Sequence, residues 1–204
     1  MQGDIITYDY YDSLYINLTN RCDCRCVFCI RDQEDAALGG LWLQEEPAKE
    51  DVLAEILGRD LSGYAELVFC GYGEPTCRAG DLFWLCDQLR AAGRDDLPPI
   101  RLNTNGHGSL INRRDITPEL AGRLDAVSVS LNASHPAEYL RLTRPRAGEA
   151  AWEALLDFLR RAGQYVPQVT VTIVDYDKTP QEIDACRRLA GELGVGFRVR
   201  PYAG

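Results

Sequence analysis

Four cysteines lie within one short segment of the chain, at Cys22, Cys24, Cys26 and Cys29. Cys22, Cys26 and Cys29 have the spacing C-x3-C-x2-C, which a single wrapping loop can bring together. Three thiolates on one loop can hold three irons of a four-iron cubane and leave the fourth iron open to an outside ligand. An open iron is a place for chemistry, whereas ligation by four cysteines usually serves electron transfer or structure. The spacing therefore predicts a 4Fe-4S cluster with Cys22, Cys26 and Cys29 as its metal ligands.

Two other uses of this segment stay open. Nearby cysteines also form structural zinc sites and clusters that only transfer electrons. A zinc knuckle usually has two separated cysteine pairs, however, and no second C-x2-C occurs in the sequence. Cys24 lies inside the motif but off its spacing, so we interpret it as a loop thiol, with a register in which it replaces a ligand as the alternative. The remaining cysteines are dispersed along the chain, and we expect one cluster.

The elements that must position these thiols alternate between short β-rich runs and amphipathic helical patterns. Strands are predicted at 14–18, 66–70, 100–104, 126–131, 168–174 and 197–200, and helices at 47–57, 81–92, 118–124, 149–162 and 180–193. This repetition implies parallel strands joined by right-handed crossovers. Because a closed eight-stranded barrel takes about 250 residues, the chain favours an α/β fold of the incomplete six-stranded kind, a (β/α)6 partial TIM barrel, with an open doubly wound sheet as the alternative.

Both folds gather ligands at the C-terminal ends of the strands, and polar or flexible residues follow several predicted strands. The segment 71–74, Gly-Tyr-Gly-Glu, permits close backbone approach and presents a carboxylate. The segment 103–105, Asn-Thr-Asn, offers amides and a hydroxyl that can bind a carboxylate or a ribose. Ser128 and Ser130 alternate on one face of their strand, as polar groups in a barrel lumen do. Ordinary turns and serines bonded to neighbouring strands are the alternatives for these segments.

Together with the cysteine motif, whose third cysteine follows Phe28, these segments resemble the radical S-adenosylmethionine (SAM) superfamily. The resemblance implies that SAM chelates the open iron, and that reductive cleavage of SAM gives a 5′-deoxyadenosyl radical that abstracts hydrogen from a substrate. Tyr72 stands where the family has a glycine, and His107 is either a proton donor or a surface residue. No residue is assigned as catalytic. The candidates for binding SAM are Phe28, Tyr72, Gly73, Glu74, Asn103, Thr104, Asn105, Ser130, Asn132, Arg200 and Tyr202.

The chain is also similar, over almost its whole length, to the small TatD-associated radical SAM proteins. The segments that carry this likeness are 14–20, 26–31, 68–78, 101–107 and 198–202. The likeness implies a functional link to a TatD-type nuclease but names no substrate. The short length resembles 7-carboxy-7-deazaguanine synthases and the activases of glycyl radical enzymes as well. An activase that installs a radical on a partner protein is therefore one alternative function, and a non-enzymatic iron-sulfur electron carrier is the other.

Composition and charge limit the remaining function classes. A formal net charge of -9 argues against binding to nucleic acid or to an anionic membrane, because such surfaces need concentrated lysine and arginine. The sequence shows no signal peptide or membrane span, so we expect a cytoplasmic, oxygen-sensitive enzyme whose cysteines are ligands or buried thiols. The length predicts a single radical SAM core domain over residues 1–204. The resemblance implies a one-electron reductant such as flavodoxin or ferredoxin, and an unidentified small-molecule or peptide substrate.

Overall fold

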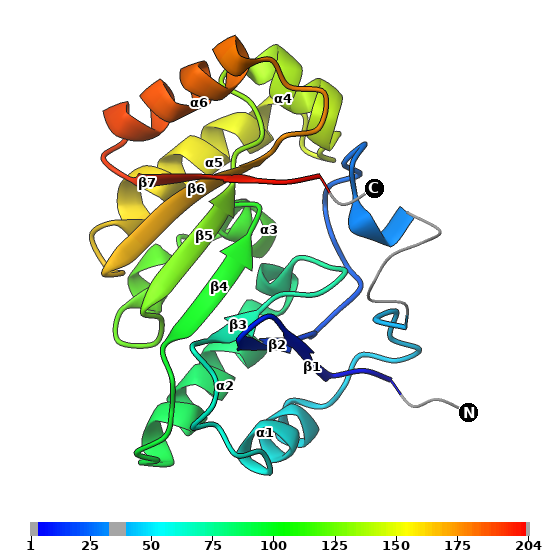
Figure 1. Ribbon diagram of the computed structural model, residues 1–204, viewed down its shortest axis with the longest axis vertical. Helices are drawn as coiled ribbons and strands as arrows, with labels where there is room; N and C mark the ends of the chain where they lie inside the picture. The colour runs from blue at the N-terminus through cyan, green and yellow to red at the C-terminus, as the bar shows by residue number, and fades with distance from the viewer. Residues whose placement is uncertain (1–3, 33–39, 203–204) are drawn as a thin grey trace.

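A seven-stranded sheet forms the centre of the computed structural model, which describes residues 4–32 and 40–202 (Figure 1). Strand order in the sheet is the same as the order in the chain, and β2 to β7 run parallel. Only β1 is antiparallel, through its pairing with β2. The strands are β1 (Thr7–Tyr10), β2 (Ser13–Ile16), β3 (Leu67–Phe69), β4 (Ile100–Thr104), β5 (Ala126–Ser130), β6 (Gln168–Val174) and β7 (Gly196–Arg200).

The strand order decides between the two predicted folds. A doubly wound sheet reverses its direction at a switch point, whereas here every crossover leads to the next strand in the same direction. Among the described residues β1 and β7 are the two ends of the sheet and do not pair with each other, so the barrel is open. The structure confirms the parallel six-stranded partial barrel and adds β1 at its edge.

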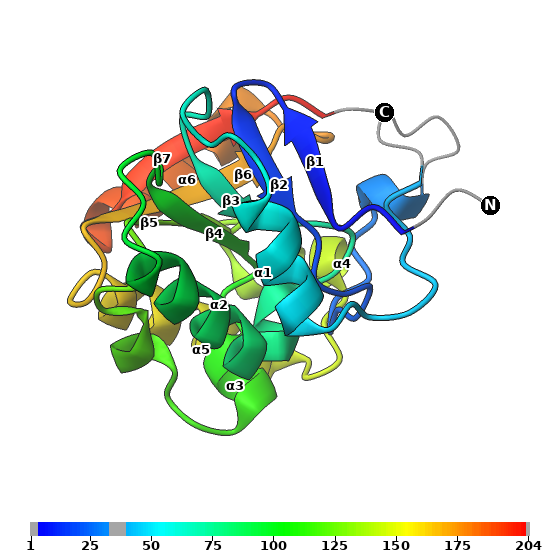
Figure 2. The same ribbon diagram turned by 90° about the horizontal axis from the view of Figure 1, so that it is seen from below.

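The helices gather on the outer side of the curved sheet, as Figures 1 and 2 show. They are α1 (Lys49–Leu57), α2 (Ala79–Ala91), α3 (Gly108–Asn112), α4 (Pro136–Thr143), α5 (Glu149–Ala162) and α6 (Pro180–Glu192). In β2 to β6, every second residue turns toward these helices and is fully or almost fully buried, including Ile16, Phe69, Leu102, Val129 and Val171. Burial of this apolar layer fixes the sheet against the helices, and leaves its other face for polar side chains.

Local signals explain where several elements begin and end. Thr179 and Glu182 form the capping box expected at the start of α6, with Pro180 at the first helical position. The helix predicted over 118–124 is a short 3-10 turn at Thr117–Leu120, because Gly122, at φ +72°, ends it.

The structure also contains β1, α3 and α4, which were not predicted. Strand β1 enters a hairpin whose turn places Tyr11 at φ +52°, without the asparagine or glycine that usually signals such a turn. Helix α4 is eight residues long, too short for a clear helical period. Within the described residues, no helix has the length and apolar character needed to cross a membrane.

Candidate cluster and cofactor site

The cysteine loop follows β2 and is held from two sides. The amides of Arg25 and Val27 donate to the carbonyl oxygens of Thr143 and Leu142, each at 2.9 Å, at the end of α4. On the other side the amide of Glu74 donates to the carbonyl oxygen of Arg21 at 2.8 Å. The loop therefore lies over the C-terminal ends of the strands, between the segments that follow β3 and β5.

The four thiols of the loop differ in environment. Cys22, Cys26 and Cys29 are partly exposed and unbridged, whereas Cys24 is 3% exposed. Hydrogen bonding with the thiols of Cys22 and Cys26 raises the pKa of Cys24, and the interaction with Cys24 lowers the pKa of Cys26. A thiolate is the form that binds iron. The donor set thus fits a cluster held by the three accessible thiols, with Cys24 as a protonated neighbour.

A second group of metal-binding atoms overlaps the loop. The ligand atoms of Cys22, Asp23 and Cys24 lie within 4.8 Å of one another. The Asp23 carboxylate, however, accepts hydrogen bonds from the side chains of Asn105 at 2.6 Å and of His107 at 2.7 Å. Asp23 is thereby engaged inside the protein, and we interpret it as a support of the loop.

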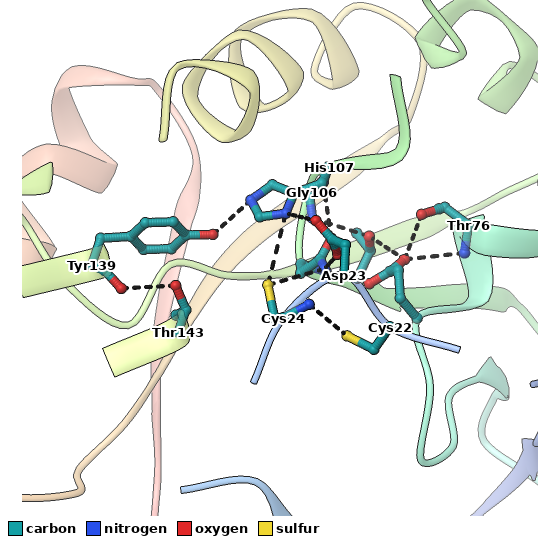
Figure 3. A network of polar contacts seen from close by, with 11 residues as sticks. Cys22, Asp23, Cys24, Thr76, Gly106, His107, Tyr139 and Thr143 are labelled. Atoms are coloured by element: carbon teal, nitrogen blue, oxygen red, sulfur yellow. Dashed lines mark hydrogen bonds and ion pairs between the residues drawn. The ribbon is translucent and has the colours of Figure 1, made fainter. Parts of the chain in front are cut away.

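His107 connects this carboxylate to α4 (Figure 3). Its Nδ1 lies 2.7 Å from the Asp23 carboxylate and its Nε2 lies 2.7 Å from the hydroxyl of Tyr139. Burial raises the pKa of Tyr139, so the phenol stays neutral and can donate to Nε2 while Nδ1–H donates to Asp23. Burial alone would raise the pKa of Asp23, but the hydrogen bonds from His107 and Asn105 lower it. His107 has no exposed surface, so the interpretation of it as a surface histidine is wrong.

The Glu74 carboxylate is buried and bonded entirely within the chain. It accepts from the Thr76 amide at 3.1 Å, the Thr76 hydroxyl at 2.6 Å, the Thr104 hydroxyl at 2.7 Å and the Asn105 amide at 2.7 Å. Burial raises the pKa of Glu74, while these donors oppose that shift. Glu74 therefore joins the ends of β3 and β4, and its contact with SAM stays a prediction.

Gly71 and Gly73 bring this segment against the cysteine loop. A Cβ added at Gly73 would lie 2.3 Å from the carbonyl oxygen of Thr19 and 2.6 Å from that of Arg21, and one at Gly71 would lie 2.1 Å from Oδ1 of Asn17. The predicted close backbone approach is thus made toward the loop itself. Half-buried Tyr72 lies between the two glycines.

Replacing Gly73 with alanine is expected to displace the loop. Because the clashing atoms belong to the backbone, relief needs a shift of the chain, and we expect a cost of about 1–3 kcal/mol in the free energy of unfolding. Thermal unfolding of the metal-free protein should therefore show a lower melting temperature, and iron retention after reconstitution should fall. Gly80→Ala is the matched control, since nothing lies within 4 Å of its Cβ position. Equal melting temperatures for the two variants would contradict the prediction.

Three other predicted SAM contacts do not lie with Glu74. Asn103 accepts from Arg101 at 2.6 Å on the inner face of the sheet. Ser130 accepts from Arg200 at 3.4 Å. Asn132, at φ +58°, accepts from the amide of Val174 at 3.0 Å and so joins the ends of β5 and β6. The structure therefore brings Thr104 and Asn105 together with Glu74, but not with these three.

An aromatic cluster lies beside the cysteine loop. Phe28 and Tyr176 have ring centroids 6.0 Å apart, and Tyr176 and Tyr202 have centroids 4.9 Å apart in an edge-to-face arrangement. Tyr176 follows β6 and Tyr202 follows β7, so the aromatic rings connect the cysteine loop to the last two strands. Sequence reasoning missed Tyr176, Asp23 and Tyr139. Only Asp23 carried a signal, through its position between two cysteines.

Known proteins resemble the chain in sequence and in fold. Residues 16–190 match the model of the radical SAM superfamily. The GTP 3′,8-cyclase of Streptomyces coelicolor is 33% identical over 134 residues, which cover 64% of this chain and 36% of the cyclase. That of Paenarthrobacter nicotinovorans is 33% identical over 149 residues, covering 68% and 39%. The chain thus spans less than half the length of these relatives.

Solved structures show the same fold at low sequence identity. SuiB of Streptococcus suis, bound to the precursor peptide SuiA, superimposes with a TM-score of 0.68 at 15% identity, covering 97% of this chain and 40% of SuiB. anSMEcpe with bound AdoMet gives a TM-score of 0.66 at 15% identity, covering 93% and 50%. The match over residues 16–190 begins at the end of β2 and includes the cysteine loop and the whole of β3, β4, β5 and β6. The chain therefore belongs to the radical SAM superfamily, whose members use a 4Fe-4S cluster and SAM.

Proposed function

We propose that the protein is a radical SAM enzyme in which Cys22, Cys26 and Cys29 hold the cluster. The observation that carries the proposal is the cysteine loop itself, with three accessible thiols at the C-terminal edge of a parallel partial barrel. When bound, the cluster supplies the electron that cleaves SAM to methionine and a 5′-deoxyadenosyl radical, which abstracts hydrogen from the substrate. The protein's task is to position these groups and to exclude competing reactions.

The chain's own residues divide this task. The hydrogen bonds that join Asp23, His107 and Tyr139 hold the cysteine loop in place. The Glu74 carboxylate holds the backbone of the segment that follows β4. The aromatic cluster of Phe28, Tyr176 and Tyr202 offers an apolar wall that can pack against the adenine ring of SAM and keep water away. Backbone groups at Tyr72 and Gly73 remain our candidates for binding the methionine end of SAM.

The finer assignments rest on the sequence. The segments 14–20, 26–31, 68–78, 101–107 and 198–202 support membership of the small TatD-associated group and a functional link to a TatD-type nuclease. We place a single core domain over residues 1–204 and a small-molecule or peptide substrate on the inner face of the barrel. A flavodoxin or ferredoxin would supply the electron. The eight unbridged cysteines support a cytoplasmic location.

Anaerobic reconstitution tests the proposed chemistry. We expect the reconstituted protein to hold about four irons per chain, and to form 5′-deoxyadenosine when SAM and dithionite are added. Chromatography of the quenched reaction measures this product, and equilibrium dialysis measures SAM binding separately. A protein with a confirmed cluster that neither binds nor cleaves SAM would contradict the proposal and favour an electron carrier.

A further inference from the structure

The inner face of the sheet is polar and carries Arg198 and Arg200, of which Arg200 is also one of the predicted SAM contacts. Side chains alternate between the two faces of each strand, so the neighbours of the buried apolar residues turn inward. The pairing Ser130↔Thr172 and Thr172↔Arg198 places these side chains in one row, and Ser128↔Thr170 forms another. The inward-facing residues are Tyr15, Arg101, Asn103, Ser128, Ser130, Thr170, Thr172, Arg198 and Arg200.

Arg200 reaches from β7 toward the middle of this face. Its Nη2 lies 3.4 Å from the hydroxyl of Ser130 on β5. The groups that act on it electrostatically come from β2 (Tyr15), from β4 (Arg101) and from the end of β3 (Cys70). Because these interacting groups belong to several strands, the Arg200 side chain lies over the concave face of the sheet.

The guanidinium of Arg200 is incompletely satisfied. Its Nε is buried and has no hydrogen-bond partner in the described part of the chain. Desolvation lowers the pKa of Arg200, and the nearby Arg198 and Arg101 lower it further. Because a buried donor on a charged group is costly to leave unpaired, an anion bound to this guanidinium would stabilise it.

Carboxylates do not balance this charge. Across the described ranges 4–32 and 40–202, no carboxylate oxygen lies within the 4.0 Å ion-pair distance of Arg198 or Arg200. Glu66 lies on the same face, but it pairs with Arg101 at 2.8 Å. A cavity of about 620 Å³ opens on this face, and Arg198 lines it together with Tyr15, Arg101 and the carboxylates of Asp12 and Glu66, whereas Arg200 does not line it. Arg198 therefore borders open space, Arg200 lies two residues further along the same face of β7, and neither has a counter-ion among the described residues.

We propose that Arg198 and Arg200 bind an anionic group of the substrate, a carboxylate or a phosphate, on the inner face of the barrel. The inference rests on the proposed function and deepens it by naming the substrate class. Guanidinium groups match the geometry of both anions through paired N–H donors. An oxyanion bound by the terminal N–H groups of both guanidinium groups would offset their positive charge.

Calorimetric titration of the anaerobically reconstituted protein with pyrophosphate and, separately, malonate tests the inference. We expect the wild type to bind at least one probe, and Arg200→Gln to weaken that binding about tenfold, since a charged hydrogen bond is worth about 1.5–3 kcal/mol. Arg198→Gln should weaken it as well, and Arg200→Lys should recover part of the loss. Arg187→Gln is the matched control, because Arg187 belongs to α6 and lies over the ring of Phe197 at 4.9 Å, so binding should not change.

The outcomes separate this inference from the proposed function. Absence of binding for both probes, or an equal loss in the Arg187→Gln control, would overturn the inference. So would an Arg200→Gln protein that loses affinity for SAM and keeps its affinity for the probes, because the guanidinium would then serve the SAM carboxylate. If circular dichroism shows that Arg200→Gln does not fold, probe binding by Arg198→Gln and Arg200→Lys tests the inference instead. If the wild type binds the probes but forms no 5′-deoxyadenosine, the result would contradict the proposed function and not the anion site.

Discussion

The Cys26→Ala protein is expected to lose its cluster and to form 5′-deoxyadenosine only at the level of an iron-free control, whereas Cys24→Ala keeps both properties. The reason lies in the environments of the two sulfurs. Cys26 is accessible, and its pKa is lowered by the bond from Cys24. Cys24 is buried, and its sulfur lies 3.8 Å from Nδ1 of His107 and 3.6 Å from Nδ2 of Asn105.

The measurement is iron content and 5′-deoxyadenosine yield for the two variants, reconstituted side by side. Cys24→Ala removes one buried sulfur and should cost about 1 kcal/mol of stability at most. It is therefore a matched control for the loss of a thiol from the same loop. If Cys24→Ala lost the cluster and Cys26→Ala retained it, the ligand set would include Cys24, as in the alternative register of the motif.

The arrangement of strands was predictable because its signals are local. Each parallel strand is a short β-rich run, and the long helices are amphipathic, so the partial barrel follows from their alternation. The cysteine spacing is equally local, and it identified the loop that we propose to hold the cluster. Strand β1 and helix α4 have four and eight residues and depend on contacts with β2 and with the cysteine loop, which no short window of sequence contains.

The connections within the site could not be predicted for a related reason. Glu74 is bonded to Thr104, which is 30 residues away, and Asp23 is bonded to His107, which is 84 residues away. These partners meet only when the loops after β2, β3 and β4 fold over the same edge of the sheet. An isolated histidine gives no pattern from which its burial or its partners can be inferred.

Replacement of His107 is expected to produce the largest loss of stability in the site. His107→Ala leaves the Asp23 carboxylate without one of its donors, leaves the Tyr139 hydroxyl without its partner, and opens a cavity where the ring was. A buried polar group that loses its partner costs about 1–3 kcal/mol, so the loss at both groups together with the cavity should cost about 3–5 kcal/mol. The melting temperature of the metal-free protein should therefore fall by about 10 °C, at about 2–4 °C per kcal/mol for a chain of this size.

The second histidine provides the control for this prediction. His135 is exposed and accepts a hydrogen bond from the Ala137 amide at 3.3 Å at the start of α4, so His135→Ala should cost about 1 kcal/mol or less. Tyr139→Phe, which removes only the hydroxyl, should fall between the two at about 1–3 kcal/mol. Iron retention should decrease in the order His135→Ala, Tyr139→Phe, His107→Ala, because Asp23 lies between Cys22 and Cys24 and its fixation fixes their backbone. If His107→Ala and His135→Ala unfold at the same temperature, the network does not support the cysteine loop, and the loop must be held by its backbone contacts with α4 and with Glu74.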